Sequence, residues 1–134
     1  MTTDLSDLAM LAVRVCLSAV FIFSAADKLI HRADAIAELE AVKLPQPALL
    51  RRLVIATQLI AGLMVLLGVH ARLGALVLAA FTALATAIAH RFWEHEGASR
   101  RMQITIALEH LAIVGGLLLL AIVGPGALAL RMGG

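Results

Sequence analysis

The chain is 134 residues long, 62% of its residues are hydrophobic, and its formal net charge is only +2. Soluble domains are close to half apolar, so this composition excludes an ordinary soluble fold and predicts a protein embedded in the lipid bilayer. The small charge gives no sign of a nucleic-acid partner, and we expect none. The single cysteine, Cys16, excludes an internal disulfide and a dithiol redox pair. We expect it to be a small packing residue.

Four apolar segments are each long enough to cross a bilayer as a helix: residues 8–29, 50–69, 72–93 and 103–124. A hydrocarbon core ~30 Å thick needs about 20 helical residues, so these segments nearly exhaust the chain. Residues 1–134 are therefore predicted to form one all-α domain, a four-helix transmembrane bundle. The first segment has no basic residue ahead of it and no clear A-x-A site after it. That pattern favours a retained helix over a cleaved signal peptide.

The stretch between the first two spans is shorter and more charged. Apolar residues recur in it at helical spacing: Ala33, Ile36, Ala37, Leu39 and Val42. Acidic and basic residues fill the other positions, which predicts a short amphipathic helix lying on the membrane surface. The prolines at 45 and 47 end it.

The last two spans are rich in small residues. Residues 68–72 form a tight connection, so the second and third spans are expected to be antiparallel neighbours. The third span is rich in alanine, and the fourth contains Gly115 and Gly116. Small residues allow helices to approach closely where lipid provides no hydrophobic drive for association.

The basic residues are distributed unevenly between the two sides of the membrane. The first and third loops share one side and hold eight of them: Lys28, Arg32, Lys43, Arg51, Arg52, Arg91, Arg100 and Arg101. The other side holds Arg72 and Arg131, with Arg14 in the span nearby. Positively charged loops remain cytoplasmic. We therefore predict both termini outside and loops 1 and 3 in the cytoplasm.

Polar residues inside the spans gather at one depth. At 1.5 Å per helical residue, the cytoplasmic half of the bundle is expected to contain Lys28, Gln58, His90, Trp93, Gln103, Glu109 and His110. An ionisable side chain within a membrane is costly and usually functional. We assign catalytic or proton-handling roles to Glu109, His110 and His90, and ligand-binding roles to Lys28, Gln58, Trp93 and Gln103. Arg14 lies apart and is expected to be structural.

Simpler roles for these residues stay open. Trp93 is also typical of an interfacial anchor, and Gln58 of a hydrogen bond between helices. His90 lies at the interface, where a histidine can simply be solvated. Glu109 needs a cation at its depth, and Lys28 is the nearest, so a structural Lys–Glu pair is the alternative to a proton-handling site.

Three kinds of ligand could use this cluster. A quinone or similar amphiphile needs hydrogen-bond donors at its carbonyls, an apolar slot and a protonatable group, and these residues are of the right types. A metal could be bound by His90, Glu94, His95, Glu96 and His110, but such spacing is common by chance, and we expect no metal. Two histidines could bind a non-covalent haem, which is also disfavoured. No CxxCH exists, so covalent haem is excluded.

Several short motifs, in this order, are similar to those of the DoxX family of small four-span bacterial membrane proteins. The resemblance covers nearly the whole chain. It rests on Arg14, residues 23–29 (FSAADKL), 44–47 (LPQP), 68–72 (GVHAR), 90–93 (HRFW), Gln103, 108–113, 115–119 (GGLLL) and 124–126 (GPG). The family's usual glycine is Ala25 in this chain, its frequent acidic residue is Gln58, and its frequent Lys-Asn is Glu109-His110.

The resemblance implies insertion in a bacterial cytoplasmic (inner) membrane and a role in redox or stress complexes. One branch of the family resembles a subunit of a thiosulfate:quinone oxidoreductase, and others resemble partners of oxidative-stress and sulfur-handling proteins. We therefore expect a membrane subunit that binds a quinone-like amphiphile, or supports electron transfer for a partner oxidoreductase. The alternative is a non-catalytic assembly or scaffold protein. A small-solute carrier is a third class, which with four spans would have to oligomerise. A protein partner or a homo-oligomer is expected in each case.

Overall fold

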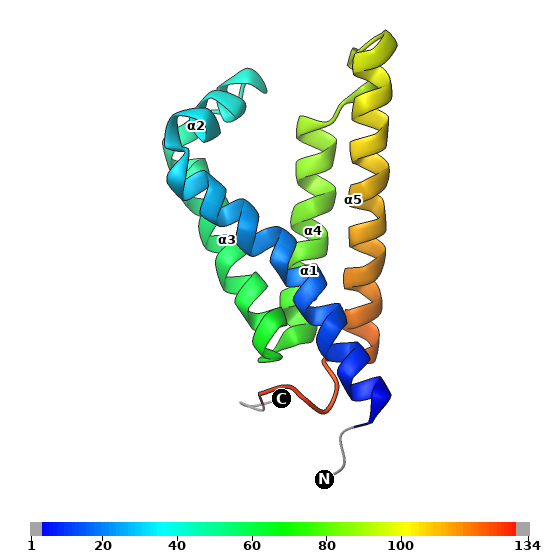
Figure 1. The fold of residues 1–134 in the computed structure, drawn as a ribbon. Helices are drawn as coiled ribbons and strands as arrows, with labels where there is room; N and C mark the ends of the chain where they lie inside the picture. The colour runs from blue at the N-terminus through cyan, green and yellow to red at the C-terminus, as the bar shows by residue number, and fades with distance from the viewer. Residues whose placement is uncertain (1–3, 131–134) are drawn as a thin grey trace.

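The computed structural model describes residues 4–130, and within them the chain is all α-helical. Four helices are long and apolar enough to cross a membrane: α1 (Leu5–Ile30), α3 (Pro47–Leu67), α4 (Ala71–Ala89) and α5 (Gly97–Val123). A short helix, α2 (Arg32–Ala41), follows α1, and a 3₁₀ turn, η1 (Phe92–Glu94), lies between α4 and α5 (Figure 1). The predicted all-α, four-span architecture with a short helix in the first loop is confirmed. Arg131, used in the charge count, lies outside the described residues.

Local signals set the ends of the helices. Asp4 caps α1 by accepting a hydrogen bond from the backbone N–H of Asp7 at 2.9 Å. Hydrogen bonds from the Ser6 hydroxyl and the Asp7 N–H hold the pKa of Asp4 below its usual value. Pro47 lies in the first turn of α3, where its missing N–H costs nothing, and Gly68 ends that helix with a φ of +79°.

Two spans differ from the predicted limits. α5 begins at Gly97 rather than at residue 103, because helical hydrogen bonding continues through polar residues that need no lipid. α4 ends at Ala89 rather than at residue 93, because His90 leaves the helical region with φ −117° and ψ 61°. Trp93 consequently lies in η1, beyond the end of α4 but within the candidate membrane-spanning segment Ala71–Glu94.

The helices pack in a chain of neighbours. α1 packs on α3, α3 on α4 and α4 on α5, whereas α1 touches α5 only slightly. α2 rests against α3 and α1. Figure 1 shows that α1 and α3 lean away from α4 and α5 toward the end that carries α2. We call this the α2 end, and we call the opposite end, with the start of α1, the α3–α4 turn and residues 124–130, the terminal end.

The buried core lies mainly toward the terminal end. It contains Phe21, Ala61, Val65, Ala75, Leu78, Ala79, Leu117 and Leu120. Glycines allow the close approach there: a Cβ added at Gly74 would lie 3.0 Å from the carbonyl oxygen of Ala61. Small residues therefore bring α3 and α4 together, as the sequence predicts for helices in lipid.

The outer surface of the bundle is apolar. Large hydrophobic side chains such as Phe23, Ile60 and Leu119 are exposed on it, as expected for a surface that faces acyl chains. Cys16 is also exposed on α1, so its predicted role as a packing residue is wrong. The reason is rotational, because Cys16 lies between the inward-facing Arg14 and Ser18.

Candidate functional site

A cavity of about 570 Å³ lies at the α2 end, where the helices diverge. Its walls are mainly apolar and come from all four spanning helices, and α2 covers one side with Ala35 and Leu39. Polar side chains also reach it: Ser24, Lys28, Glu38, Arg51, Thr57, Gln58, Thr82, His90 and His110. A mostly apolar hollow with a few convergent polar groups is the usual form of a small-molecule site.

Ser24 connects two of the predicted ligand-binding residues. Lys28 Nζ donates a hydrogen bond to Ser24 Oγ at 2.5 Å, and Gln58 Nε2 donates to the same oxygen at 3.1 Å. Gln58 is only 4% exposed, and among the described residues no donor reaches its Oε1. The wall between α1 and α3 therefore contains a buried acceptor without a partner.

Two histidines form the opposite polar wall. The His90 and His110 rings meet edge to face with centroids 5.1 Å apart and planes at 77°. His110 Nδ1 lies 2.8 Å from Thr86 Oγ1, and His90 Nδ1 lies 2.8 Å from Gln103 Oε1. Each imidazole is thus held by a side chain of the neighbouring helix. Thr86 of α4 contacts His110 of α5, and Gln103 of α5 contacts His90 at the end of α4.

Arg51 fixes the α1 side of the site. It is buried, and its Nε donates to the carbonyl oxygen of Lys28 at 3.0 Å. That carbonyl belongs to the last turn of α1, where carbonyls have no partner within the helix. Arg51 therefore holds the end of α1, and with it Lys28, against α3.

The structure brings together four of the seven predicted site residues. Lys28, Gln58, His90 and His110 line the cavity, and Gln103 contacts His90. Trp93 is 60% exposed on η1, where its ring packs edge to face against Phe92.

Glu109 does not join the cluster. Its side chain is exposed on α5, whereas the next residue, His110, faces the cavity. The alternative of a Lys28–Glu109 ion pair is wrong, because the ion pairs of the described residues are His31–Asp27 and Arg91–Glu94. Successive helical residues point ~100° apart, and the turn of α5 places His110 inward.

Sequence reasoning missed the hydroxyl residues that organise the site. Ser24 joins Lys28 to Gln58, and Thr86 holds His110. Serine and threonine hydrogen-bond across or along helices in membranes, so a hydroxyl residue at the depth of the ionisable groups was the available signal.

The metal-binding pattern does not assemble in the described residues. No three His, Cys, Asp or Glu side chains of residues 4–130 come close enough together to hold an ion.

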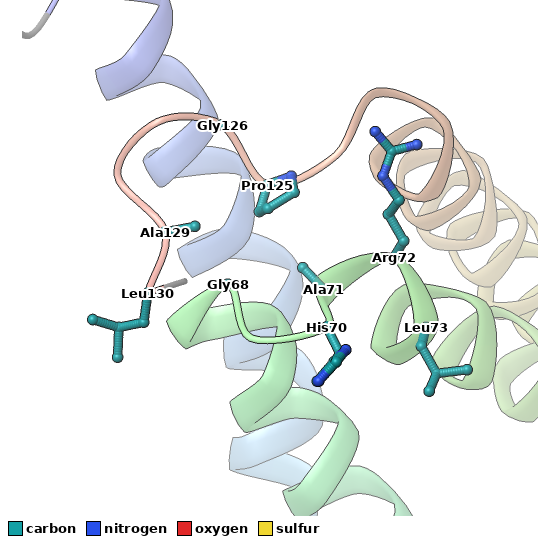
Figure 2. Close-up of a pocket in the computed structure, with 9 residues that line it drawn as sticks. All are labelled: Gly68, His70, Ala71, Arg72, Leu73, Pro125, Gly126, Ala129 and Leu130. Atoms are coloured by element: carbon teal, nitrogen blue, oxygen red, sulfur yellow. The ribbon is translucent and has the colours of Figure 1, made fainter. Parts of the chain in front are cut away.

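A second hollow of about 590 Å³ lies at the terminal end, where residues 124–130 fold back beside the α3–α4 turn (Figure 2). Its polar groups are already engaged or solvent-exposed. Arg72 donates to the carbonyl oxygen of Ile122 at 2.8 Å, capping α5, and His70 is exposed in the turn. The two hollows are similar in size, so volume does not show which one suits a ligand. The hollow at the α2 end is the better candidate, because the buried, unpartnered Oε1 of Gln58 lies in its wall.

Comparisons with known proteins agree with the resemblance seen in the motifs. The chain is 33% identical over 123 residues to inner membrane protein YqjF of Escherichia coli K12, covering 92% of this chain and 89% of that protein. It is 25% identical over 121 residues to inner membrane protein YphA of the same organism, covering 90% and 86%. No solved structure matches it. Residues 9–91 match the sequence model of the DoxX family, and the chain belongs to this family as a multi-pass inner membrane protein.

Proposed function

We propose that the cavity at the α2 end binds a quinone-like amphiphile, and that the chain is the membrane subunit of an oxidoreductase system. The observation that carries this proposal is the buried Oε1 of Gln58, which has no partner among the described residues. Leaving a buried polar atom without a hydrogen bond costs about 1–3 kcal/mol. A bound ligand that donates a hydrogen bond to this atom, as the hydroxyl of a reduced quinone can, removes that cost.

The remaining cavity residues suit a ring compound with polar groups on an apolar body. Phe21, Phe81 and Ile113 provide an apolar lining for a ring or tail. Lys28 supplies a charged donor, and His90 and His110 supply groups that can exchange protons near neutral pH. Gln103 acts on the ligand only through His90, and Trp93 is best suited to anchoring η1 at the membrane interface.

A partner oxidoreductase supplies or removes electrons in this proposal. The chain has one cysteine and therefore no dithiol of its own to exchange electron pairs with a quinone. The two-electron change of the ring must then be matched by a redox centre on another protein, while this chain holds the ring and exchanges protons. A non-catalytic scaffold is the competing outcome, in which a partner co-purifies but the cavity binds nothing.

Quinone binding by the purified full chain tests the proposal. Decyl-ubiquinol, whose hydroxyls can donate to Gln58 Oε1, is titrated under anaerobic conditions into detergent-solubilised protein by calorimetry, and native lipids are extracted for quinone by mass spectrometry. We expect saturable binding that weakens about tenfold or more in Gln58→Leu. Thr105→Val is the control, since the Thr105 hydroxyl bonds to the carbonyl of Arg101 on the exposed side of α5.

Glu109→Gln tests whether Glu109 contacts the ligand or lies outside the cavity, as its exposure on α5 indicates. Exposure outside the cavity predicts unchanged quinone affinity, whereas a ligand-contacting role predicts a loss. Absence of binding in the parent chain, or equal binding in Gln58→Leu, would contradict the proposal.

We also propose that the α2 end faces the cytoplasm. The basic residues of the first and third loops support this orientation. A reporter fused to the C-terminus should be active only outside the cytoplasm, and a cytoplasmic signal would reverse the assignment.

A further inference from the structure

We propose that the cavity selects the reduced, hydrogen-bond-donating form of its ring ligand, a hydroquinone or phenol, over the carbonyl form. This inference rests on the proposed function and deepens it. It follows from the direction of each hydrogen bond around the cavity, which decides whether the groups left facing the ligand are donors or acceptors.

The hydrogen bonds of Thr86 fix the state of His110. The Thr86 hydroxyl has one hydrogen, and it donates this hydrogen to the carbonyl oxygen of Thr82 at 2.7 Å. Thr86 Oγ1 can therefore only accept at its 2.8 Å contact with His110, so His110 Nδ1 carries the proton. In the neutral ring the lone pair then belongs to Nε2, so the acceptor that His110, a cavity-lining residue, keeps free of Thr86 is Nε2.

Gln103 fixes His90 in the same way. The Oε1 of Gln103 accepts at 2.8 Å from Nδ1 of His90, which must carry the proton. Nε2 of neutral His90 is then a second acceptor. The two rings come from α4–η1 and α5 and meet edge to face, so both acceptors belong to one wall.

Other polar groups of the cavity are acceptors as well. Gln58 Oε1 is the buried acceptor on the opposite wall. The hydroxyls of Thr57 and Thr82 also line the cavity, and each donates its hydrogen to its own helix, at Leu53 O (2.8 Å) and Leu78 O (2.7 Å). Only lone pairs of these two residues remain for a ligand.

Donors also line the cavity, among them the hydroxyl hydrogen that Ser24 keeps while it accepts from Lys28 and Gln58. Lys28 keeps ammonium hydrogens beyond the one given to Ser24, while Arg51 directs Nε and one terminal nitrogen to the carbonyls of Lys28 and Leu29. A quinone offers only acceptors and leaves Gln58, His90 and His110 without partners. A hydroquinone has two hydroxyl donors that can satisfy acceptors on opposite walls. Buried acceptors left unpaired are costly, so the reduced form binds more tightly.

Paired ligands test this selectivity without changing the protein. Calorimetry on the detergent-solubilised full chain compares decyl-ubiquinol with decyl-ubiquinone under anaerobic conditions. A redox-inert pair, 4-decylphenol and its methyl ether, repeats the comparison for a donor and its blocked analogue. We expect the donor of each pair to bind about tenfold more tightly.

Variants then show which residues cause the preference for the hydrogen-bond-donating ligand. Thr86→Val removes the acceptor that fixes the His110 proton and should reduce the phenol-to-ether ratio toward one, whereas Thr86→Ser should restore it. Gln58→Leu should reduce the ratio, and Thr105→Val should leave it unchanged. Thermal unfolding of each variant confirms that it is folded.

The outcomes separate this inference from the proposed function. Equal affinity for both members of each pair, or tighter binding of the quinone and the ether, overturns the selectivity while the quinone site stands. Failure of all four ligands to bind overturns both.

Discussion

The two ends of the bundle surround their buried polar side chains with different groups, backbone at the terminal end and a cavity at the α2 end. At the terminal end, Arg14 is 1% exposed, and its guanidinium donates to the carbonyl oxygens of Leu66 (2.5 Å) and Leu128 (2.8 Å). At the α2 end, Gln58 is buried almost as completely, yet its oxygen has no partner among the described residues. Arg14 Nε also has no partner among the described residues, but Arg14 is packed between backbone segments, whereas Gln58 lines the cavity.

The difference depends on which groups meet each polar side chain. Carbonyls at the ends of α3 and in residues 124–130 have no helical donors, so an arginine with five N–H groups can satisfy several at once. Small residues beside them let the helices close over the contact. At the α2 end α1 diverges from α5, and the polar side chains face a cavity rather than backbone. The close-packed core and the cavity thus share the same four helices but lie mainly in different halves.

The largest expected effect on stability comes from removing the Arg14 contacts at the terminal end. Arg14→Leu removes two charged hydrogen bonds and leaves two buried carbonyls, which should lower the free energy of unfolding by roughly 3 to 5 kcal/mol. Denaturation in mixed detergent micelles measures this change. Arg52→Leu is the control, since the Arg52 side chain is exposed on α3. Equal stability of the two variants would show that the Arg14 contacts add nothing.

Substitution of two glycines, Gly68 and Gly115, tests the next largest effect on stability. Gly68 has a φ of +79°, and a Cβ there would overlap Ala129 of the returning segment. Gly68→Ala should therefore cost about 2 kcal/mol through the left-handed backbone and the overlap. Gly115 of α5 has nothing within 4 Å of an added Cβ, so Gly115→Ala should be neutral or slightly stabilising in the same unfolding assay. Similar losses at both positions would contradict the close approach at the terminal end.

Filling the cavity at the α2 end should change ligand affinity more than the free energy of unfolding. Ala85 lines the cavity, and Ala85→Leu places three more carbons in it. We expect the free energy of unfolding to change by less than about 1 kcal/mol, while quinone affinity is lost. Ala83→Leu on the exposed side of α4 is the matched control. Retained affinity in Ala85→Leu would place the ligand elsewhere.

The smallest effect concerns the first turn of α1. The pKa of Asp4 is lowered in the folded protein, so its capping contribution is present above the unfolded pKa and is lost as the pH falls through the folded pKa. Asp4→Ala should lower the melting temperature by about 2 °C near neutral pH and by less in acid. Asp4→Asn keeps the cap and should remove this pH dependence. A difference that does not shrink in acid would contradict a charged cap.

Depth along the membrane was predictable from the sequence, whereas direction around each helix was not. Apolar length correctly predicted four spans and the short helix, and the rise per residue placed Lys28, Gln58, His90 and His110 at one level. It also placed Glu109 there, although that side chain faces outward. In lipid both the inner and outer faces of a helix such as α5 are apolar, so hydrophobic periodicity does not give its rotation. Helix packing decides it, and packing depends on residues far apart in the chain.

The hydrogen bonds of Arg14 to Leu66 and Leu128 also constrain the order in which the structure can form during synthesis. The second acceptor of Arg14, Leu128, lies 114 residues later in the chain, and Leu130 closes the same end by donating its N–H to Leu67 O. During synthesis, α1 must enter the membrane with a guanidinium whose partners have not yet been translated. The full set of Arg14 contacts can therefore form only after the last span has been translated, and until then the buried guanidinium lacks its Leu128 acceptor.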